Sequence, residues 1–303
     1  MDISSLDPIK LIVALIIAAT PLVLAAIGEV VVEKSGVLNL GVEGMMIMGA
    51  IGGFAISVQS GSPYLGLIAG GISGILLSLI FAFLTQVLMT NQVATGLALT
   101  MFGLGMSALI GQPFNGIKPP SSMRLDFVDA LKDVSLVGAI FIILSIVAVI
   151  GVQWFLKHSK RGLILRAVGE NHNAAHSIGY NVVAIRFAAI AFGGLMAGLG
   201  GACISLVRVP QWTEGMTAGI GWIALALVVF GAWKPWRVMA GAYLFGGVTI
   251  AQLNLQAIGV AIRPEYLAML PYILTILVLV VMSRKASGGT APASLGQIFH
   301  GRS

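Results

Sequence analysis

Long runs of apolar residues dominate this chain and restrict what it can fold into. Runs long enough to cross a bilayer as helices begin near Ile9, Leu40, Tyr64, Val93, Ser135, Arg186, Thr217, Trp236 and Glu265. A chain that is 58% hydrophobic and only 9% charged cannot bury so much apolar surface in one water-soluble core. The sequence therefore predicts an all-α polytopic membrane protein with about nine transmembrane helices, in a range of roughly eight to ten.

The seventh run is the weakest candidate for a full crossing. It extends only from Gly219 to Trp233, which is short against the roughly 30 Å of hydrocarbon in a bilayer. The sequence therefore predicts a re-entrant or broken helix at this point.

Two short patterns bear on how the helices pack. The tripeptide Glu43-Gly44-Met45 recurs as Glu214-Gly215-Met216, each time ahead of a Gly-rich apolar run. An inverted repeat would place such copies on opposite sides of the membrane, although a tripeptide can also recur by chance. Small residues one helical turn apart let helix backbones approach closely, and they occur at Gly49/Gly53, Gly70/Gly74 and Gly194/Gly198.

The basic residues are divided unequally between the two sides of the membrane. With nine spans and an outside N-terminus, eleven of the 17 Lys and Arg residues lie inside and six lie outside. The largest inside group is a polar island from Lys157 to Arg186. The positive-inside rule therefore places this island and the C-terminus in the cytosol, with the chain in the inner (plasma) membrane. The basic residues are not interleaved with aromatics on a polar face, so no nucleic-acid partner is expected.

The same pattern divides the chain into two regions. Residues 1–284 form the transmembrane domain, which includes the cytosolic loop 157–186. Residues 285–303 are rich in small and polar residues, so we expect a disordered cytosolic tail. The single cysteine, Cys203, excludes an intramolecular disulfide.

Three glutamates within or beside apolar runs need an explanation, because a carboxylate in hydrocarbon costs several kcal/mol. These are Glu29, Glu33 and Glu43, and glycines at positions 36 and 41 interrupt the helical pattern around them. We expect a structural elbow near the inner interface. A role in a gate or a solute pathway is the alternative.

Neutral polar residues also occur in the apolar runs. The candidate pathway residues are Asn39, Glu43, Asn91, Gln92, Thr95, Gln252, Asn254 and Gln256. Amides and hydroxyls suit an uncharged, hydroxyl-rich solute, whose hydrogen bonds to water they can replace. They are equally consistent with hydrogen bonds between helices.

No catalytic or metal site is predicted. The chain has no Gly-Lys dipeptide and therefore no phosphate-binding Gly-x-x-x-x-Gly-Lys loop. His172 and His176 have the spacing of two zinc ligands on a helix, but Asn173 stands where a metalloprotease has Glu, and no third ligand is nearby. We interpret these histidines as solvated surface residues.

The polar island contains the signature of a short helix. Asn171 or Asn173 can cap its start, and Gly179 can end it. Its small apolar face would consist of Ala174, Ala175 and Ile178. About two turns are too few for an isolated helix to be stable in water, so this helix must dock on a partner. Flanking basic residues can hold the loop at the membrane surface, and these are Lys160, Arg161, Arg166 and Arg186.

The run Arg166-Ala167-Val168-Gly169-Glu170-Asn171, followed by Ala174-Ala175 and Gly179, resembles the cytosolic loop of permease subunits in bacterial ABC importers. The branch is the one that contains the branched-chain amino-acid, ribose-type sugar and nucleoside systems. The resemblance implies that this segment is the coupling helix that the ATP-hydrolysing subunit binds. The coupling residues that it implies are Arg166, Gly169, Glu170, Asn171, Ala174, Ala175 and Gly179. His172 and Asn173 depart from the family's usual Pro and Glu, which puts the start of the helix and its contacts in question.

The resemblance extends from about Leu6 to Arg284. The segments 33–50 and 91–103 are similar to motifs of the nucleoside and simple-sugar permeases in particular. The resemblance implies an importer permease for a nucleoside or a related sugar-like solute, with no enzyme activity of its own. The alternatives are a ribose-type sugar or branched-chain amino-acid permease, or a self-sufficient secondary transporter or channel.

The resemblance also implies partners. Two cytosolic ATPases would bind ATP and Mg, and this chain would bind no cofactor. A second permease, either a related longer chain or a second copy, would complete the pathway. An extracytoplasmic solute-binding lipoprotein would dock on the outer loops at residues 115–133 and 208–214.

Overall fold

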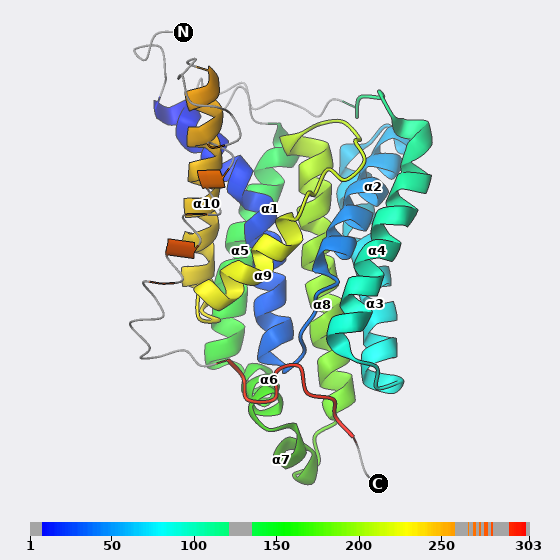
Figure 1. Cartoon of the computed structure of the whole chain (residues 1–303), viewed down its shortest axis with the longest axis vertical. Coiled ribbons are helices and arrows are strands. Elements are labelled where there is room, and N and C mark those ends of the chain that lie inside the picture. The colour runs from blue at the N-terminus through cyan, green and yellow to red at the C-terminus, as the bar shows by residue number, and fades with distance from the viewer. Residues whose placement is uncertain are drawn as a thin grey trace.

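The computed structural model describes residues 8–120, 135–257 and 291–300, and the single positions 266, 269, 270, 273, 276, 277 and 280. These residues form a bundle of helices, as predicted (Figure 1). Seven of the helices in them are long and apolar enough to cross a membrane. They are α1 (Pro8–Lys34), α2 (Val42–Ser60), α3 (Pro63–Ala82), α4 (Gln92–Gly111), α5 (Leu136–His158), α8 (Val182–Cys203) and α10 (Pro235–Ala257).

The predicted runs correspond to observed helices, except that the run near Glu265 lies largely outside the described residues. Single π-helical turns, Phe83–Val87 and Ile204–Arg208, lengthen α3 and α8. The polar island adds two short helices, α6 (Lys160–Glu170) and α7 (His172–Ser177). A 3₁₀ turn, Gln112–Phe114, follows α4.

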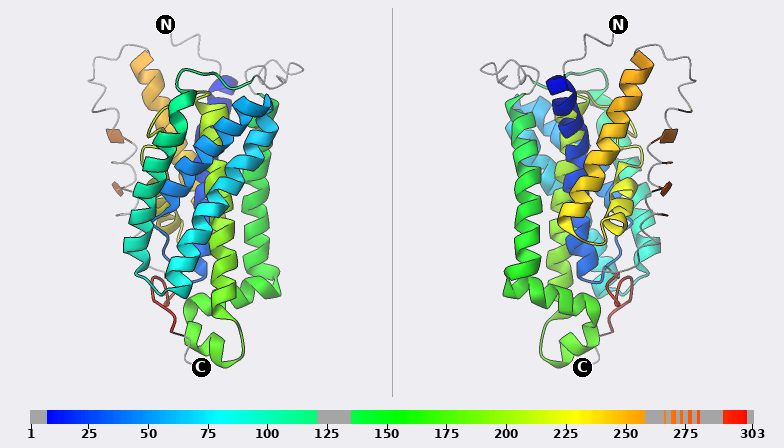
Figure 2. Two further views of the ribbon diagram at one scale, coloured as in Figure 1. Left: turned by 90° about the vertical axis from the view of Figure 1, so that its right-hand side faces the viewer. Right: turned by 90° about the vertical axis from the view of Figure 1, so that its left-hand side faces the viewer.

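The long helices run between two ends of the molecule. We call one the α6–α7 end, because α6 and α7 project there beyond the long helices (Figure 2). Residues 291–300 lie at this same end, whereas α1 begins at the opposite end (Figure 1).

Two helices begin part-way along the bundle. The helix α9 (Ile220–Phe230) has 11 residues, or about 17 Å at 1.5 Å per residue, roughly half of a hydrocarbon core. The chain descends to it from the opposite end through residues 209–219, which confirms the predicted broken helix (Figure 1). The segment 35–41 rises from the α6–α7 end before α2 begins (Figure 1). Thus α2 and α9 start deep in the bundle after entries from opposite ends, as an inverted repeat predicts.

The two Glu-Gly-Met tripeptides are nevertheless not equivalent in the structure. Glu43 lies in the first turn of α2 and is only 3% exposed. Glu214 is exposed in the loop ahead of α9. The repeated letters therefore do not mark matching positions, although the helices that follow them have inverted directions.

The predicted glycine pairs meet in one seam between α2, α3 and α8. A Cβ atom on Gly70 would lie 3.0 Å from the carbonyl oxygen of Gly49 and would overlap the Cβ of Ala202 at 2.5 Å. One on Gly74 would lie 2.7 Å from the Cα of Gly198. Only hydrogen fits at these positions, so the backbones of the three helices are in direct contact.

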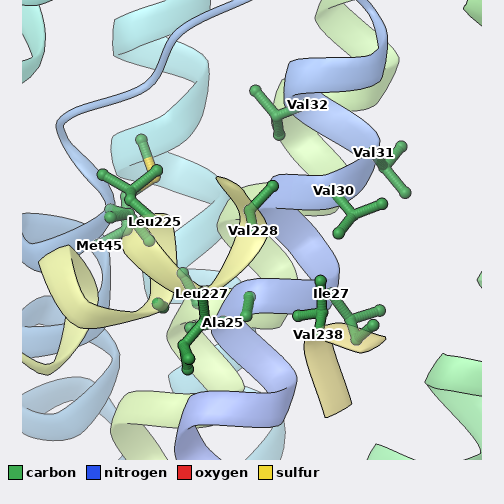
Figure 3. Close-up of a cluster of buried hydrophobic side chains, with 14 of the residues drawn as sticks. Ala25, Ile27, Val30, Val31, Val32, Met45, Leu225, Leu227, Val228 and Val238 are labelled. Carbon is green, nitrogen blue, oxygen red and sulfur yellow. The ribbon is translucent and has the colours of Figure 1, made fainter. Parts of the chain in front are cut away.

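The helix α1 lies at the centre of the bundle (Figure 2). Its residues from Ala18 to Val32 are all buried, because neighbouring helices surround it. Figure 3 shows part of this core, where Ile27 and Val30 of α1 pack with Leu225 and Val228 of α9 and Met45 of α2. The broken helix α9 is therefore held by the central helix.

Candidate functional site

The helix α7 has the caps that the sequence predicts. The side chain of Asn171 accepts a hydrogen bond from the Ala174 backbone N–H at 2.9 Å. Gly179 has φ = 91°, in the left-handed region. The Tyr180 N–H donates to the Ala175 carbonyl at 3.1 Å, and the Gly179 N–H donates to that of His176 at 2.8 Å. These two bonds form a Schellman motif, which ends the helix at Gly179.

The apolar residues of α7 divide between two faces, and the predicted single apolar face is wrong. Ala175 is 2% exposed and packs with Val168 and Val182. Ala174 is exposed, and Ile178 is 72% exposed. Ala175 therefore attaches α7 to the bundle, while Ile178 presents a large apolar side chain outside it.

The junction between α6 and α7 packs tightly on the end of α1. Gly169 is buried, and a Cβ atom there would collide with the Lys34 carbonyl oxygen and lie 3.2 Å from the Gly36 nitrogen. Arg166 is half-buried, and its Nε has no hydrogen-bond partner among the described residues. Glu170 accepts a long hydrogen bond of 3.5 Å from the Ala293 N–H. Position 169 must therefore be glycine, because the backbone at the end of α1 lies too close for any side chain.

Three expectations for this end of the molecule are wrong. His172 was interpreted as a solvated surface residue, but it is 5% exposed and its Nδ1 lies 3.3 Å from the Arg186 guanidinium. The tail 285–303 was expected to be disordered, but residues 291–300 pack on α6 and α7, because their backbone groups find partners and Phe299 is 7% exposed. The remainder of that tail lies outside the described residues. Arg186 does not hold the loop at a membrane surface, since it is fully buried and bonds to protein groups. Lys160 and Arg161 are exposed, as that role requires.

The predicted pathway residues of the fourth run make structural hydrogen bonds at the α6–α7 end. Asn91 caps α4 by accepting from the Ala94 N–H at 3.0 Å. Gln92 is buried and accepts from the Leu38 N–H at 2.8 Å. The Thr95 hydroxyl lies 2.8 Å from that of Thr90. These contacts favour the alternative that the sequence left open, namely bonds within the protein.

Asn39, Glu29 and Glu33 form the elbow that the glycine breaks predict. The Asn39 side chain donates to Glu29 at 2.9 Å, and its carbonyl oxygen accepts from the Gly41 N–H at 3.0 Å. Glu33 accepts from the indole N–H of Trp233 at 2.5 Å, which ties the end of α1 to the turn after α9. The other oxygen of Glu29 has no hydrogen-bond partner in the described part of the chain.

Glu43 does not belong to this elbow. It lies deep in the bundle and accepts three hydrogen bonds from the start of α9: from the Thr217 hydroxyl at 2.5 Å, the Gly219 N–H at 3.0 Å and the Gly221 N–H at 2.6 Å. A helix N-terminus has unpaired N–H groups and a partial positive charge, so it stabilises a carboxylate. Glu43 therefore caps α9 from the first turn of α2, and the N-termini of α2 and α9 meet at its side chain.

The remaining pathway candidates lie on α10, near the opposite end. Gln252, Asn254 and Gln256 are half-buried, and Asn254 donates to the Ile250 carbonyl within its own helix at 2.8 Å. Because α4 begins at the α6–α7 end and α10 finishes at the opposite end, the structure does not bring the predicted candidates together (Figure 1).

A groove of about 750 Å³ lies between α5, α6 and α8. Its lining is almost entirely apolar, with side chains such as Val147, Val152 and Phe192, and Arg161 and Tyr180 at its α6–α7 end. It lacks the set of hydrogen-bonding groups that a hydroxyl-rich solute needs. The lining of the groove therefore does not match the hydroxyl-rich solute that the sequence predicts.

The outer loops that the sequence proposes for docking lie side by side. Asn115 forms an isolated parallel bridge with Trp212, and the Trp212 side chain is buried. Residues 121–133 of the proposed docking region lie outside the described residues. The described parts of both loops are at the end opposite α6 and α7.

Comparison with known proteins identifies the class. Residues 11–279 match the family model described as the permease component of branched-chain amino acid transport systems. The chain belongs to this permease family. The prediction of a permease subunit of this class, which is not itself an enzyme, is confirmed.

Individual relatives cover most of the permease. A putative glucose ABC transporter permease of Haloferax volcanii is 41% identical over 257 residues, which are 82% of this chain and 78% of the relative. The guanosine ABC transporter permease NupQ of Bacillus subtilis is 34% identical over 299 residues, covering 92% and 93%. The nucleoside ABC transporter permease NupC of Lactococcus lactis is 31% identical over 299 residues, covering 92% and 94%.

The chain is also similar, at lower identity, to a second permease from one of these organisms. A second guanosine ABC transporter permease of Bacillus subtilis, NupP, is 27% identical over 251 residues, which are 76% of this chain and 72% of the relative. Bacillus subtilis therefore has two permeases named for guanosine, and this chain is more similar to NupQ than to NupP.

Proposed function

We propose that this permease is the membrane-spanning subunit of an ABC importer and that it carries a nucleoside or a related sugar-like solute. Three relatives of this chain are named for glucose, guanosine and nucleosides, all of which are rich in hydroxyl groups. The observation that carries the proposal is α7, a capped two-turn helix that projects from the bundle (Figure 2). Ile178, the residue that follows its last turn, is 72% exposed.

A cytosolic ATPase binds the exposed face of α7. An exposed isoleucine beside a small helix that projects past the transmembrane helices can insert into an apolar pocket of a partner. Ala174 and Gly179 beside it have little or no side chain, so a groove of the partner can close around Ile178. The ATPase binds ATP and Mg, and this chain supplies only the helix that the ATPase moves.

The α6–α7 end faces the cytosol, and the complex lies in the plasma membrane. The excess of Lys and Arg on this side supports that orientation. A solute-binding lipoprotein then docks at the opposite end, on the loops joined by Asn115 and Trp212.

A second permease completes the pathway, and we propose that it is a related, longer chain. The two guanosine permeases of Bacillus subtilis support a pair of unlike subunits. The amides of Gln252 and Gln256 remain partly accessible on α10, so this face is our candidate for the solute pathway. ATP-driven closure of the ATPases moves α7 and biases the permease between outward and inward access.

The proposal is tested by purifying the permease from its native host and identifying its partners. Uptake of labelled nucleosides is then compared with uptake of glucose, ribose and branched-chain amino acids in vesicles with and without ATP. We expect an ATPase, a longer permease and ATP-dependent nucleoside or sugar uptake. Preference for branched-chain amino acids would contradict the solute class, and ATP-independent uptake by the chain alone would contradict the importer.

Binding of the ATPase to the exposed face of α7 can be tested separately with two substitutions. Ile178→Asp places a charge in the apolar contact, and Gly179→Arg places a bulky residue at φ = 91°, where L residues are strained. Both variants should insert in the membrane but lose ATPase co-purification or coupled hydrolysis. Gln59→Asp, at an exposed position in the last turn of α2 at the opposite end, is the control and should retain both. Normal transport by Ile178→Asp would contradict binding of the ATPase at this face of α7.

A further inference from the structure

Arg186 connects several distant segments at the α6–α7 end. Its guanidinium donates to the Ser35 carbonyl at 3.3 Å and to the Gln297 carbonyl at 3.1 Å, and it lies 3.3 Å from Nδ1 of His172. A longer bond of 3.5 Å reaches the Gln86 side chain. Within the described ranges no carboxylate pairs with this buried cation. Its stability therefore depends on neutral acceptors, one of which comes from the C-terminal segment.

Residues 294–297 form the centre of that segment. The Ser294 N–H donates to the Gly169 carbonyl at 2.9 Å, and the Gly296 N–H donates to that of Gly36 at 3.1 Å. The Ser294 hydroxyl donates to the Glu170 backbone carbonyl at 3.3 Å and accepts from the backbone N–H of His172 at 3.4 Å. The segment therefore joins the end of α1, the α6–α7 junction and α8.

Phe299 attaches the same segment to α7. Its ring is edge-on to the rings of His172 and His176, with both centroid distances 5.3 Å. It is 7% exposed and belongs to an apolar cluster with Val168, Ala175 and Val182. Because α7 has only six residues, its position depends on contacts of this kind and not on its own helical stability.

We propose that residues 291–300 are a positioning clasp, which holds α7 to Arg186 and the bundle so that displacement of α7 moves the transmembrane helices. Without the clasp, α7 is held only by its backbone links, the packing of Ala175 and the contact of His172 with Arg186, so it can move more freely. This inference rests on the proposed function, since it takes the ATPase as the partner that displaces α7. The clasp residues contact neither ATP nor solute, and they act through α7.

The clasp is tested in the complete transporter, reconstituted in vesicles with its binding protein and labelled solute. Phe299→Ala removes the aromatic anchor. We expect the ATPases still to co-purify and ATP hydrolysis to persist, while solute transported per ATP falls about tenfold, as loss of a buried aromatic contact can produce. Phe299→Leu retains apolar volume and should restore much of this ratio.

Gln297→Ala is the matched control. The Gln297 side chain donates to the Ala293 carbonyl in its own segment. The backbone carbonyl of residue 297, which accepts a hydrogen bond from Arg186, is still present after the substitution. This variant should keep most of its coupling. An unchanged ratio of transport to hydrolysis in Phe299→Ala would overturn the clasp. Loss of the ATPase from that variant would also overturn it, since the segment would then be part of the docking surface.

A second readout is independent of transport. Amide hydrogen exchange at residues 172–178 should accelerate about tenfold in Phe299→Ala and remain unchanged in Gln297→Ala. Equal exchange in the two variants would overturn the clasp even if transport changed. Failure of the unmodified complex to bind an ATPase would instead count against the proposed function, so the two failures are distinguishable.

Discussion

Glu43 shows how a single carboxylate can be stable deep inside a membrane protein. Its three donors all come from the start of α9, so the unpaired N–H groups of that helix and the charge of the carboxylate satisfy each other. The bonded groups are more than 170 positions away along the chain. Capping rules apply to neighbours in sequence, which is why an interfacial elbow was expected for Glu43.

Glu43→Gln should destabilise the permease. The amide NH₂ of glutamine would face backbone N–H donors, and one buried N–H without an acceptor costs about 1 to 3 kcal/mol. The measurement is the unfolding temperature of the purified permease in detergent. Glu214→Gln is the control, because Glu214 is exposed in the second Glu-Gly-Met copy. Equal unfolding temperatures for the two variants would contradict the cap.

His172 makes the contact between α7 and the C-terminal segment sensitive to pH. Burial lowers the pKa of His172 below its ordinary value of 6.5, and the charges of Arg186 and His300 lower it further. The neutral imidazole is therefore favoured when the segment is docked, and protonation opposes docking. Docking has its full strength above pH 6.5 and weakens as the pH falls below it.

This effect can be measured by hydrogen exchange at residues 171–178, at about pH 7.5 and about pH 5.5 with correction for the intrinsic rate. Protection should fall at the lower pH in the unmodified protein. His172→Gln removes the titrating group at this position, and its protection should change less. The same decrease in both proteins would assign the effect to another group.

Among the elements, those with local signals were predicted best. Asn171 and Gly179 lie at the ends of α7 and cap it through neighbours in sequence, so its limits follow from the chain alone. The short apolar run likewise predicted α9. The order in residues 291–300 could not be predicted, because Phe299 and Ser294 find their partners on α6, α7 and α8. The composition of a segment indicates its polarity. It does not indicate which distant residues its backbone groups will bond to.

The glycine seam gives a prediction at the level of helix packing. Gly198→Leu should prevent α8 from approaching α3, because backbone atoms of Gly70 and Gly74 occupy the space. Gly105→Leu on α4 is the control, since a Cβ there has no neighbour within 4 Å. Monodisperse protein recovered after detergent extraction should fall sharply for the first variant only. Comparable recovery of both would contradict direct backbone contact.

At the scale of the whole molecule, the arrangement of the ends tests the topology. The native Cys203 is 1% exposed, so cysteines introduced elsewhere can be labelled separately. Gln59→Cys and Ile178→Cys lie at opposite ends of the bundle, at exposed positions. An impermeant thiol reagent added to intact cells, with the outer membrane permeabilised if one is present, should label Gln59→Cys only. Labelling of both variants from one side would contradict the arrangement.

The meeting of α2 and α9 at Glu43 has an electrical consequence for the transporter. Each helix start is equivalent to about half a positive charge, so the two together offset about one negative charge on Glu43. With the charges balanced in this way, a transmembrane voltage exerts little net force on this part of the permease. The rate of uptake should therefore change little when a potassium diffusion potential is imposed on vesicles, and a steep dependence would contradict this balance of charges.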